Sequence, residues 1–183
     1  MRKSLLHFTL FASLVAIPSV ASAQRRVPAA ESGAVIGDVG IFFPRSEALD
    51  PAPVLHGFYE YYFTPRGSLR VGLGWANPSW AQRDDEGLRT LRVAIDGVYN
   101  WERGAIHPFV GAGLAIHFLQ PSRNGESVGD SETKPGASFF GGAEFFTSRT
   151  VAFKAEARYD ALGEAFGINP DGLSLTAGLK KYF

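Results

Sequence analysis

The segment Thr150–Leu162 limits the possible folds of this chain more than any other stretch, because its side chains fall into two opposite classes. Alternate positions carry Val151, Phe153, Ala155, Ala157, Tyr159 and Ala161, and the positions between them carry Lys154, Glu156, Arg158 and Asp160. Side chains of a β-strand point alternately to opposite faces, so the segment predicts a strand with one apolar and one charged face. In a soluble sheet the charged face meets water. In a transmembrane barrel it lines the interior, and the apolar face meets lipid.

Composition narrows the choice of protein class. The chain has 183 residues, no cysteine and a formal net charge of zero, which indicates one modest domain without disulfides or thiolate metal sites. The absence of Lys/Arg runs argues against nucleic acid as a partner. No His/Asp/Glu cluster has the spacing of metal ligands, so we expect neither a metal nor another cofactor.

The N-terminus has the pattern of a secretory signal peptide. Arg2 and Lys3 precede the apolar stretch Leu5–Ile17, and Ala21-Ser22-Ala23 supplies small residues for cleavage. We therefore predict a signal peptide over residues 1–23, cleavage near Ala23 and a short periplasmic tail over residues 24–32. No cysteine follows the cleavage site, which excludes a lipoprotein. No later apolar run is long enough for a membrane helix, so any membrane residence must be as a barrel.

Seven further segments alternate in the same way as Thr150–Leu162. They are Gly33–Phe43, Val54–Thr64, Ser68–Ala76, Arg89–Trp101, Ile106–Leu119, Gly136–Thr147 and Gly172–Phe183. Short connections (Thr64–Gly67, Glu102–Ala105 and Thr147–Arg149) alternate with longer polar ones (Pro44–Pro53, Asn77–Leu88, Gln120–Pro135 and Gly163–Asp171). Short turns on one side and long loops on the other are typical of outer-membrane barrels. The prediction is an all-β fold over residues 33–183, an eight-stranded antiparallel up-and-down transmembrane β-barrel.

The two faces of these strands support that prediction. On the apolar face, aromatic residues gather near the loop ends (Phe43, Trp75, Phe118, Phe139, Tyr159) and the turn ends (Tyr61, Phe63, Tyr99, Trp101, Phe145, Phe153, Phe183), as two membrane interfaces would select. The opposite face carries five basic and six acidic residues: Asp38, Glu60, Arg70, Arg92, Asp96, Glu144, Lys154, Glu156, Arg158, Asp160 and Lys180. Eight strands enclose room only for side chains. Unpaired buried charges are costly, so we predict an interior ion-pair network.

Three segments carry a resemblance to a known family. These are His107-Pro-Phe-Val-Gly-Ala-Gly-Leu114, Glu156-Ala-Arg-Tyr159 and the terminal Leu175–Phe183. The mature chain resembles the small Gram-negative outer-membrane β-barrels of the OmpA-transmembrane-domain and OmpX type. The resemblance implies the cell outer membrane as location, and its lipid and lipopolysaccharide as surroundings.

The same resemblance implies how the chain is inserted. The C-terminal aromatic and the alternate residues before it would be the signal read by the barrel-assembly machinery: Leu175, Ala177, Leu179, Lys181 and Phe183. We expect a monomer. Because no peptidoglycan-binding domain follows Phe183 in the sequence, the resemblance does not extend to cell-wall anchoring.

Function is less constrained than fold. We expect a structural or surface-interaction protein and no enzyme. The loop Gln120–Pro135 is the best surface for a partner, but its length and polarity favour a loop that is simply mobile. One alternative is a lipid A-modifying hydrolase or acyltransferase, for which His117 with Ser122 or Ser127 is the best base and nucleophile. His117, like His56 and His107, falls on an inward-facing position of its strand, which favours a structural role for this histidine. Another alternative is a small-solute channel, although eight strands leave no open pore.

Overall fold

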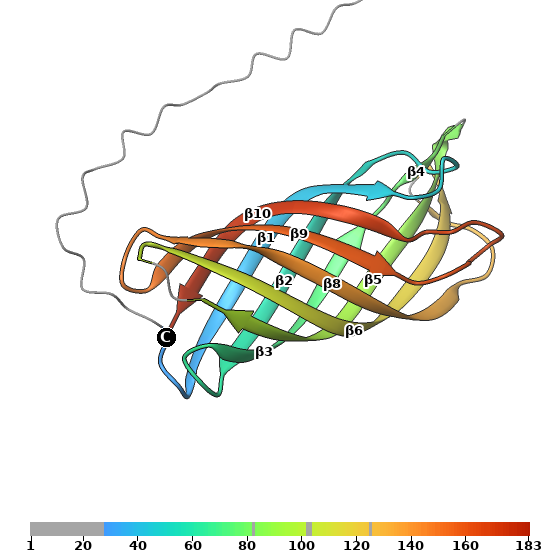
Figure 1. Cartoon of the computed structure of the whole chain (residues 1–183). Helices are drawn as coiled ribbons and strands as arrows, with labels where there is room; N and C mark the ends of the chain where they lie inside the picture. The colour runs from blue at the N-terminus through green and yellow to red at the C-terminus, as the bar shows by residue number, and fades with distance from the viewer. Residues whose placement is uncertain (1–27, 82, 102–103, 125) are drawn as a thin grey trace, which may run out of the picture.

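The computed structural model describes residues 28–81, 83–101, 104–124 and 126–183, apart from the side chain of Asp84 (Figure 1). The predicted signal peptide, residues 1–23, and residues 24–27 of the predicted tail lie outside the described residues. Within the described part, every element of regular secondary structure is a strand. That part contains no helix long and apolar enough to cross a membrane.

Eight long strands form one closed sheet. They are β1 (Ser32–Pro44), β2 (Ala52–Tyr62), β3 (Gly67–Ala76), β5 (Arg83–Asn100), β6 (Ile106–Arg123), β8 (Glu132–Phe146), β9 (Val151–Ala161) and β10 (Gly172–Tyr182). Each pairs antiparallel with its neighbours in sequence, and β1 pairs with β10 to close the ring (Figure 1). The predicted eight-stranded up-and-down barrel is therefore confirmed, and a closed sheet has no unpaired edge to expose in a membrane.

Two strands are longer than the barrel needs. β5 and β6 each have 18 residues, compared with 11 in β2, β9 and β10. They stay paired past the barrel rim to Glu86 and Arg123. The two-residue strands β4 (Ser79–Trp80) and β7 (Glu126–Ser127) pair with these extensions. We call the paired segments 83–88 and 120–123 the rim hairpin.

The predicted loops Asn77–Leu88 and Gln120–Pro135 are therefore wrong in their extent. Most of the first belongs to β4 and β5. The second contains the end of β6, all of β7 and the start of β8. Side-chain alternation weakens where both faces of a strand leave the membrane, whereas the main-chain pairing continues. Side-chain alternation in the sequence therefore does not predict such extensions.

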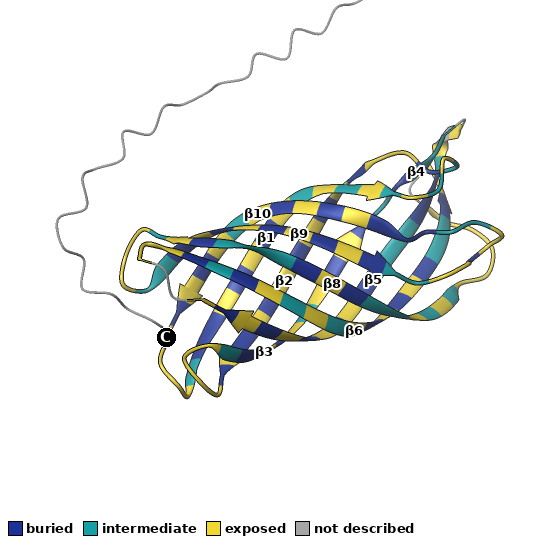
Figure 2. Ribbon diagram, viewed as in Figure 1, coloured by how far each residue is buried: buried dark blue, intermediate teal, exposed yellow. Residues whose placement is uncertain are grey.

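Burial alternates along every barrel strand (Figure 2). All twelve aromatic residues assigned above to the two interface belts face outward, with exposed fractions from 36% at Tyr159 to 68% at Phe183. Aliphatic side chains between them, such as Val39, Leu73 and Leu114, are also exposed. Soluble monomers rarely expose apolar patches larger than a few hundred Å². An apolar surface around the whole barrel is instead typical of contact with lipid.

Apolar clusters close both ends of the interior. At the end with the long loops, Leu49, Leu88, Leu119 and Ala165 are buried together, with Trp80, Leu162 and Ile168 against them. We call this cluster the loop plug. At the end with the short turns, Ala34, Tyr62, Ala152 and Tyr182 pack with Phe146, and we call this the floor cluster. Between the two lies the charged interior.

Candidate functional site

The charged interior is the most distinctive part of the molecule. All eleven ionisable residues assigned to the inner face are buried, and none is more than 5% exposed. They come from every barrel strand except β6. This distribution follows from the alternation of each strand, since one parity of every strand faces the lumen.

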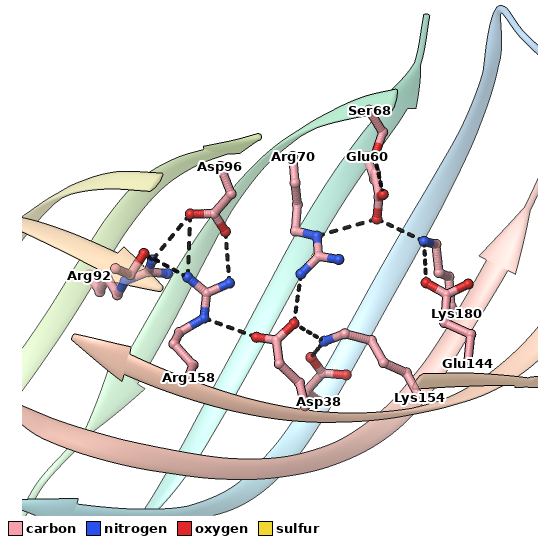
Figure 3. A network of polar contacts seen from close by, with 12 residues as sticks. Asp38, Glu60, Ser68, Arg70, Arg92, Asp96, Glu144, Lys154, Arg158 and Lys180 are labelled. Atoms are coloured by element: carbon pink, nitrogen blue, oxygen red, sulfur yellow. Dashed lines mark hydrogen bonds and ion pairs between the residues drawn. The ribbon is translucent and has the colours of Figure 1, made fainter. Parts of the chain in front are cut away.

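Lys180 organises the half of the network nearer the floor cluster (Figure 3). Its ammonium nitrogen lies 2.8 Å from Glu60 Oε2 and 2.7 Å from Glu144 Oε1, and it donates a hydrogen bond of 2.6 Å to the Tyr62 hydroxyl. The Tyr182 hydroxyl donates to the other oxygen of Glu144. One buried cation therefore joins two carboxylates from different strands.

Arg70 and Lys154 extend the network to the centre. Arg70 Nε lies 3.2 Å from Glu60 Oε2, and its Nη1 lies 2.8 Å from Glu156 Oε2. Lys154 Nζ lies 2.9 Å from the same Glu156 oxygen and also pairs with Asp38. Glu156 thus receives cations from opposite sides of the barrel.

Arg158 carries the network on toward the loop plug. Its Nε lies 2.9 Å from Glu156 Oε1, and its Nη2 lies 2.8 Å from Asp96 Oδ2. Arg92 then pairs with Asp96 at 3.4 Å and, through Nε, with Asp160 at 3.2 Å. Every one of the eleven charges is therefore linked to the others through ion pairs. Ion pairs of this kind offset the cost of removing the charges from water.

Aromatic residues inside the barrel were not part of the sequence prediction. Phe58, Phe109 and Phe140 are buried among the cations. The Arg158 guanidinium lies 3.9 Å from the centroid of the Phe140 ring, and the Arg70 guanidinium lies 5.2 Å from those of Phe58 and Phe140. Contacts of a desolvated cation with a ring face are attractive. The rings also fill space that charged side chains leave open.

Each of these three rings lies beside a glycine of the neighbouring strand. In the strand register, Phe58 is opposite Gly72, Phe109 opposite Gly142 and Phe140 opposite Gly111. A Cβ at any of the three glycines would overlap the ring. These aromatic residues and the glycines beside them all occupy inward-facing positions of their strands. That combination is visible in the sequence and could have identified the interior rings.

The structure does not bring the candidate catalytic residues together. His117 is buried in the lumen, and neither of its ring nitrogens has a hydrogen-bond partner among the described residues. The Ser122 hydroxyl donates to the Gly87 carbonyl at 3.3 Å, and Ser127 is exposed on β7. The described residues also contain no group of three or more His, Asp or Glu side chains that could hold a metal ion.

The five residues of the predicted assembly signal lie on the outer face of the barrel or at its end. Leu175, Ala177, Leu179, Lys181 and Phe183 are all exposed. The chain end is fixed to β1, since Phe183 and Gly33 exchange two backbone hydrogen bonds of 3.0 and 3.1 Å. Their role as a signal stays a prediction.

A closed antiparallel barrel with an apolar exterior, aromatic residues at both ends and a charged, filled interior defines a transmembrane β-barrel protein. The chain belongs to the outer membrane protein beta-barrel domain family, whose model matches residues 8–180. Membership of this family indicates the outer membrane as its location. No curated protein sequence matches the chain.

Solved structures of small outer-membrane barrels share the fold. The chain is similar to the outer membrane protein OprG from Pseudomonas aeruginosa, with a TM-score of 0.67, 10% identity, and 85% of this chain and 97% of that chain covered. The N-terminal β-barrel domain of Pseudomonas aeruginosa OprF gives 0.62, 16% identity, and 84% and 98% coverage. Ail, the attachment invasion locus protein of Yersinia pestis, gives 0.58, 14% identity, and 85% and 99% coverage. At these identities the likeness concerns the fold alone.

Proposed function

We propose that this protein is a monomeric, non-enzymatic barrel of the Gram-negative outer membrane that serves envelope structure or surface interaction. One observation carries the proposal: the interior is filled by a single ion-pair network and covered by apolar clusters at both ends. A lumen of this kind supports the barrel rather than a substrate. The surface for partners is then the end that bears the long loops, which we assign to the cell exterior.

The rim hairpin is the best candidate for that surface. Arg83 Nη1 lies 2.9 Å from Glu86 Oε2, and Arg123 pairs with the other oxygen of Glu86. Arg83 and Glu86 border a hollow of about 540 Å³ that is also lined by Trp80 and Pro121. Paired strands hold this surface in a fixed shape, which lowers the entropic cost of binding a partner.

A gene-deletion strain tests the structural or surface role. We expect the deletion to increase sensitivity to detergent or to reduce attachment to surfaces, with both measured on the same cultures. The wild-type gene should restore the lost property. The triple variant Arg83→Ala, Glu86→Ala, Arg123→Ala should restore detergent resistance and not attachment. A deletion strain that matches its parent in both measurements would contradict the proposal.

The lipid A-modifying alternative requires a base and a nucleophile that face the lipid. His117 is buried in the lumen and Ser122 hydrogen-bonds to a backbone carbonyl, which supports the non-enzymatic proposal. Mass spectrometry of lipid A from strains with and without the gene separates the two. We expect identical acyl patterns, and a gene-dependent change in acylation would favour the enzyme.

The channel alternative requires an aqueous path past the loop plug, the ion pairs and the floor cluster. We expect the purified protein to give no steady conductance in planar bilayers, because Leu88 and Leu119 are fully buried above the network. Sustained single-channel currents in most insertions would make the channel the better proposal. Neither outcome depends on the surface role.

A further inference from the structure

A small cavity separates the ion-pair network from the loop plug. Its volume is about 40 Å³, and its polar lining comes from His56, Thr90, Arg92, His117, Asp160 and Ser174. Leucines of the loop plug form its roof. One water needs roughly 10–15 Å³ of such volume, so the cavity has room for about three waters, or for one small ion with a water.

The polar lining leaves hydrogen-bonding capacity unused. His56 Nδ1, both ring nitrogens of His117 and Arg92 Nη1 have no partner among the described residues. The three side chains are at most 7% exposed. Arg92 Nη2 donates to Asp96 and Ser138. Arg92 Nε lies 3.2 Å from Asp160 Oδ1 as an ion pair, but these two atoms make no hydrogen bond with the described residues. A buried guanidinium N–H without an acceptor is unfavourable, so a guest that accepts hydrogen bonds would be held there.

Glycines make room for the two imidazole rings. His56 lies opposite Gly74 in the register of β2 and β3, and a Cβ at Gly74 would come within 2.8 Å of its ring. A Cβ at Gly136 would come within 3.1 Å of His117 Nε2. The absence of a side chain at Gly74 and Gly136 therefore leaves the space that the two rings occupy beside the cavity.

The charges around His117 set what the guest can be. In the register, His117 lies between Arg92 of β5 and Lys134 of β8, and Lys134 pairs with Glu132 at 2.7 Å. His56 and Asp160 also line the cavity, and Asp160 Oδ1 lies 3.2 Å from Arg92 Nε. A proton added to His117 alone would face the fixed charge of Arg92, and an anion added alone would face the carboxylate of Asp160. Added together, the two leave the net charge of the interior unchanged.

We propose that this cavity binds one small monovalent anion of halide size, and that His117 takes up one proton with it. Arg92 Nη1 and the protonated imidazole of His117 donate to the anion, while the loop plug keeps bulk water away from all three. Fixed donors in a site without bulk water bind an anion more strongly than they would at the surface. The site is independent of the surface role proposed above.

Chloride binding to the full-length protein, folded in detergent micelles, tests this site. If one proton binds with each anion, the chloride affinity must fall about tenfold for each unit by which the pH rises, over the range in which His117 is neutral in the free protein. We expect ³⁵Cl NMR line broadening to show binding at pH 5 and a loss of affinity that follows this slope up to pH 8. Gluconate at equal ionic strength, too large for the cavity, should not compete.

The variant His117→Asn keeps a polar side chain and cannot take up the proton, so it should bind chloride at least tenfold more weakly at pH 5. His107→Asn is the matched control, because His107 is equally buried but hydrogen-bonds to the Gly104 carbonyl near the turns. It should leave the affinity unchanged. If His117→Asn does not fold, the imidazole NMR signals of His117 in the wild-type protein provide the test instead. These signals should shift when chloride is added and not when gluconate is added. No chloride broadening at pH 5, an affinity independent of pH, or equal effects of both variants would overturn the proposal.

Discussion

At the scale of single residues, the two faces of each strand obey opposite rules. A side chain that faces lipid must avoid charge, and a charged side chain that faces the lumen must keep its partner. Leu175 and Lys180 of β10 represent the two cases, with exposed fractions of 47% and 0%. The alternation of β10 puts them on opposite sides of the barrel wall although they are five residues apart.

Lys180→Ala should lower the free energy of unfolding by about 3–5 kcal/mol, because it leaves a buried carboxylate without its cation. Glu60 keeps Arg70 and Ser68, whereas Glu144 keeps only the Tyr182 hydroxyl among the partners described. Denaturant titration in detergent micelles measures the loss. Lys181→Ala is the matched control, since Lys181 faces outward and hydrogen-bonds to Thr150 Oγ1 at 2.8 Å. An equal effect of the two variants would contradict the role of the network.

Leu175→Arg should cost about 2–4 kcal/mol, the range for an arginine near the middle of the lipid face. From alternation alone we would rank Lys180→Ala as the milder change, because the sequence does not show how few partners Glu144 has. With the contacts known, we expect Lys180→Ala to be at least as costly. The same titration ranks them, and a neutral Leu175→Arg would mean that this face does not meet lipid.

At the scale of elements, glycines set how closely neighbouring strands approach. A Cβ on Gly178 of β10 would overlap the Gly37 carbonyl and Asp38 of β1. Gly37 itself faces outward, with no heavy atom within 4 Å of the Cβ it would carry. The two glycines lie on adjacent strands and differ in which side of the wall they face.

Gly178→Ala should therefore destabilise the barrel by about 1–3 kcal/mol through overpacking. Gly37→Ala should be neutral or stabilise it, because alanine loses less conformational freedom on folding. Urea unfolding of both variants in the same detergent compares them directly. If both alanines cost the same, the closeness of β1 and β10 is not what requires Gly178.

The rim hairpin should respond to pH. Hydrogen bonds from Arg123 and then Arg83 lower the pKa of Glu86 below its usual value. A lowered pKa contributes order that is present above the ordinary pKa of a glutamate and is lost as the pH falls through the lowered one. The protection factors for amide hydrogen exchange at Gly87 and Ser122, which correct for the intrinsic pH dependence of exchange, should therefore be highest near neutral pH and fall on acidification. Glu86→Gln should remove this pH dependence, and high salt should weaken it.

At the scale of the whole molecule, closure of the sheet makes unfolding cooperative. β1 and β10 are the first and last strands, and their eleven register pairs complete the ring. Ion pairs also cross the lumen between strands far apart in sequence, as between Arg70 of β3 and Glu156 of β9. The barrel cannot open at one seam without breaking both kinds of contact.

Unheated protein from purified outer membranes should therefore migrate differently from boiled protein in a gel with dodecyl sulfate, because the closed barrel resists the detergent. Replacing Arg158 with alanine should lower the temperature at which the two mobilities merge, since among the described residues Arg158 is the cation that joins Glu156 to Asp96. Arg45→Ala, at an exposed position in the loop after β1, is the control. Identical mobility of unheated and boiled wild-type protein would count against the closed barrel.

The sequence by itself determined the barrel and the two faces of its wall. Alternation at Thr150–Leu162 and seven other segments is local, and the geometry of a strand converts it directly into inside and outside. Only the tertiary structure decided which charges meet, because the partner of Lys180 or Arg158 depends on strand register and on side chains from across the lumen. It also decided the rim hairpin, the loop plug and the interior rings, which depend on main-chain pairing and packing between distant segments. These contacts leave no periodic pattern in the sequence, and they fill the barrel that the periodic pattern predicts.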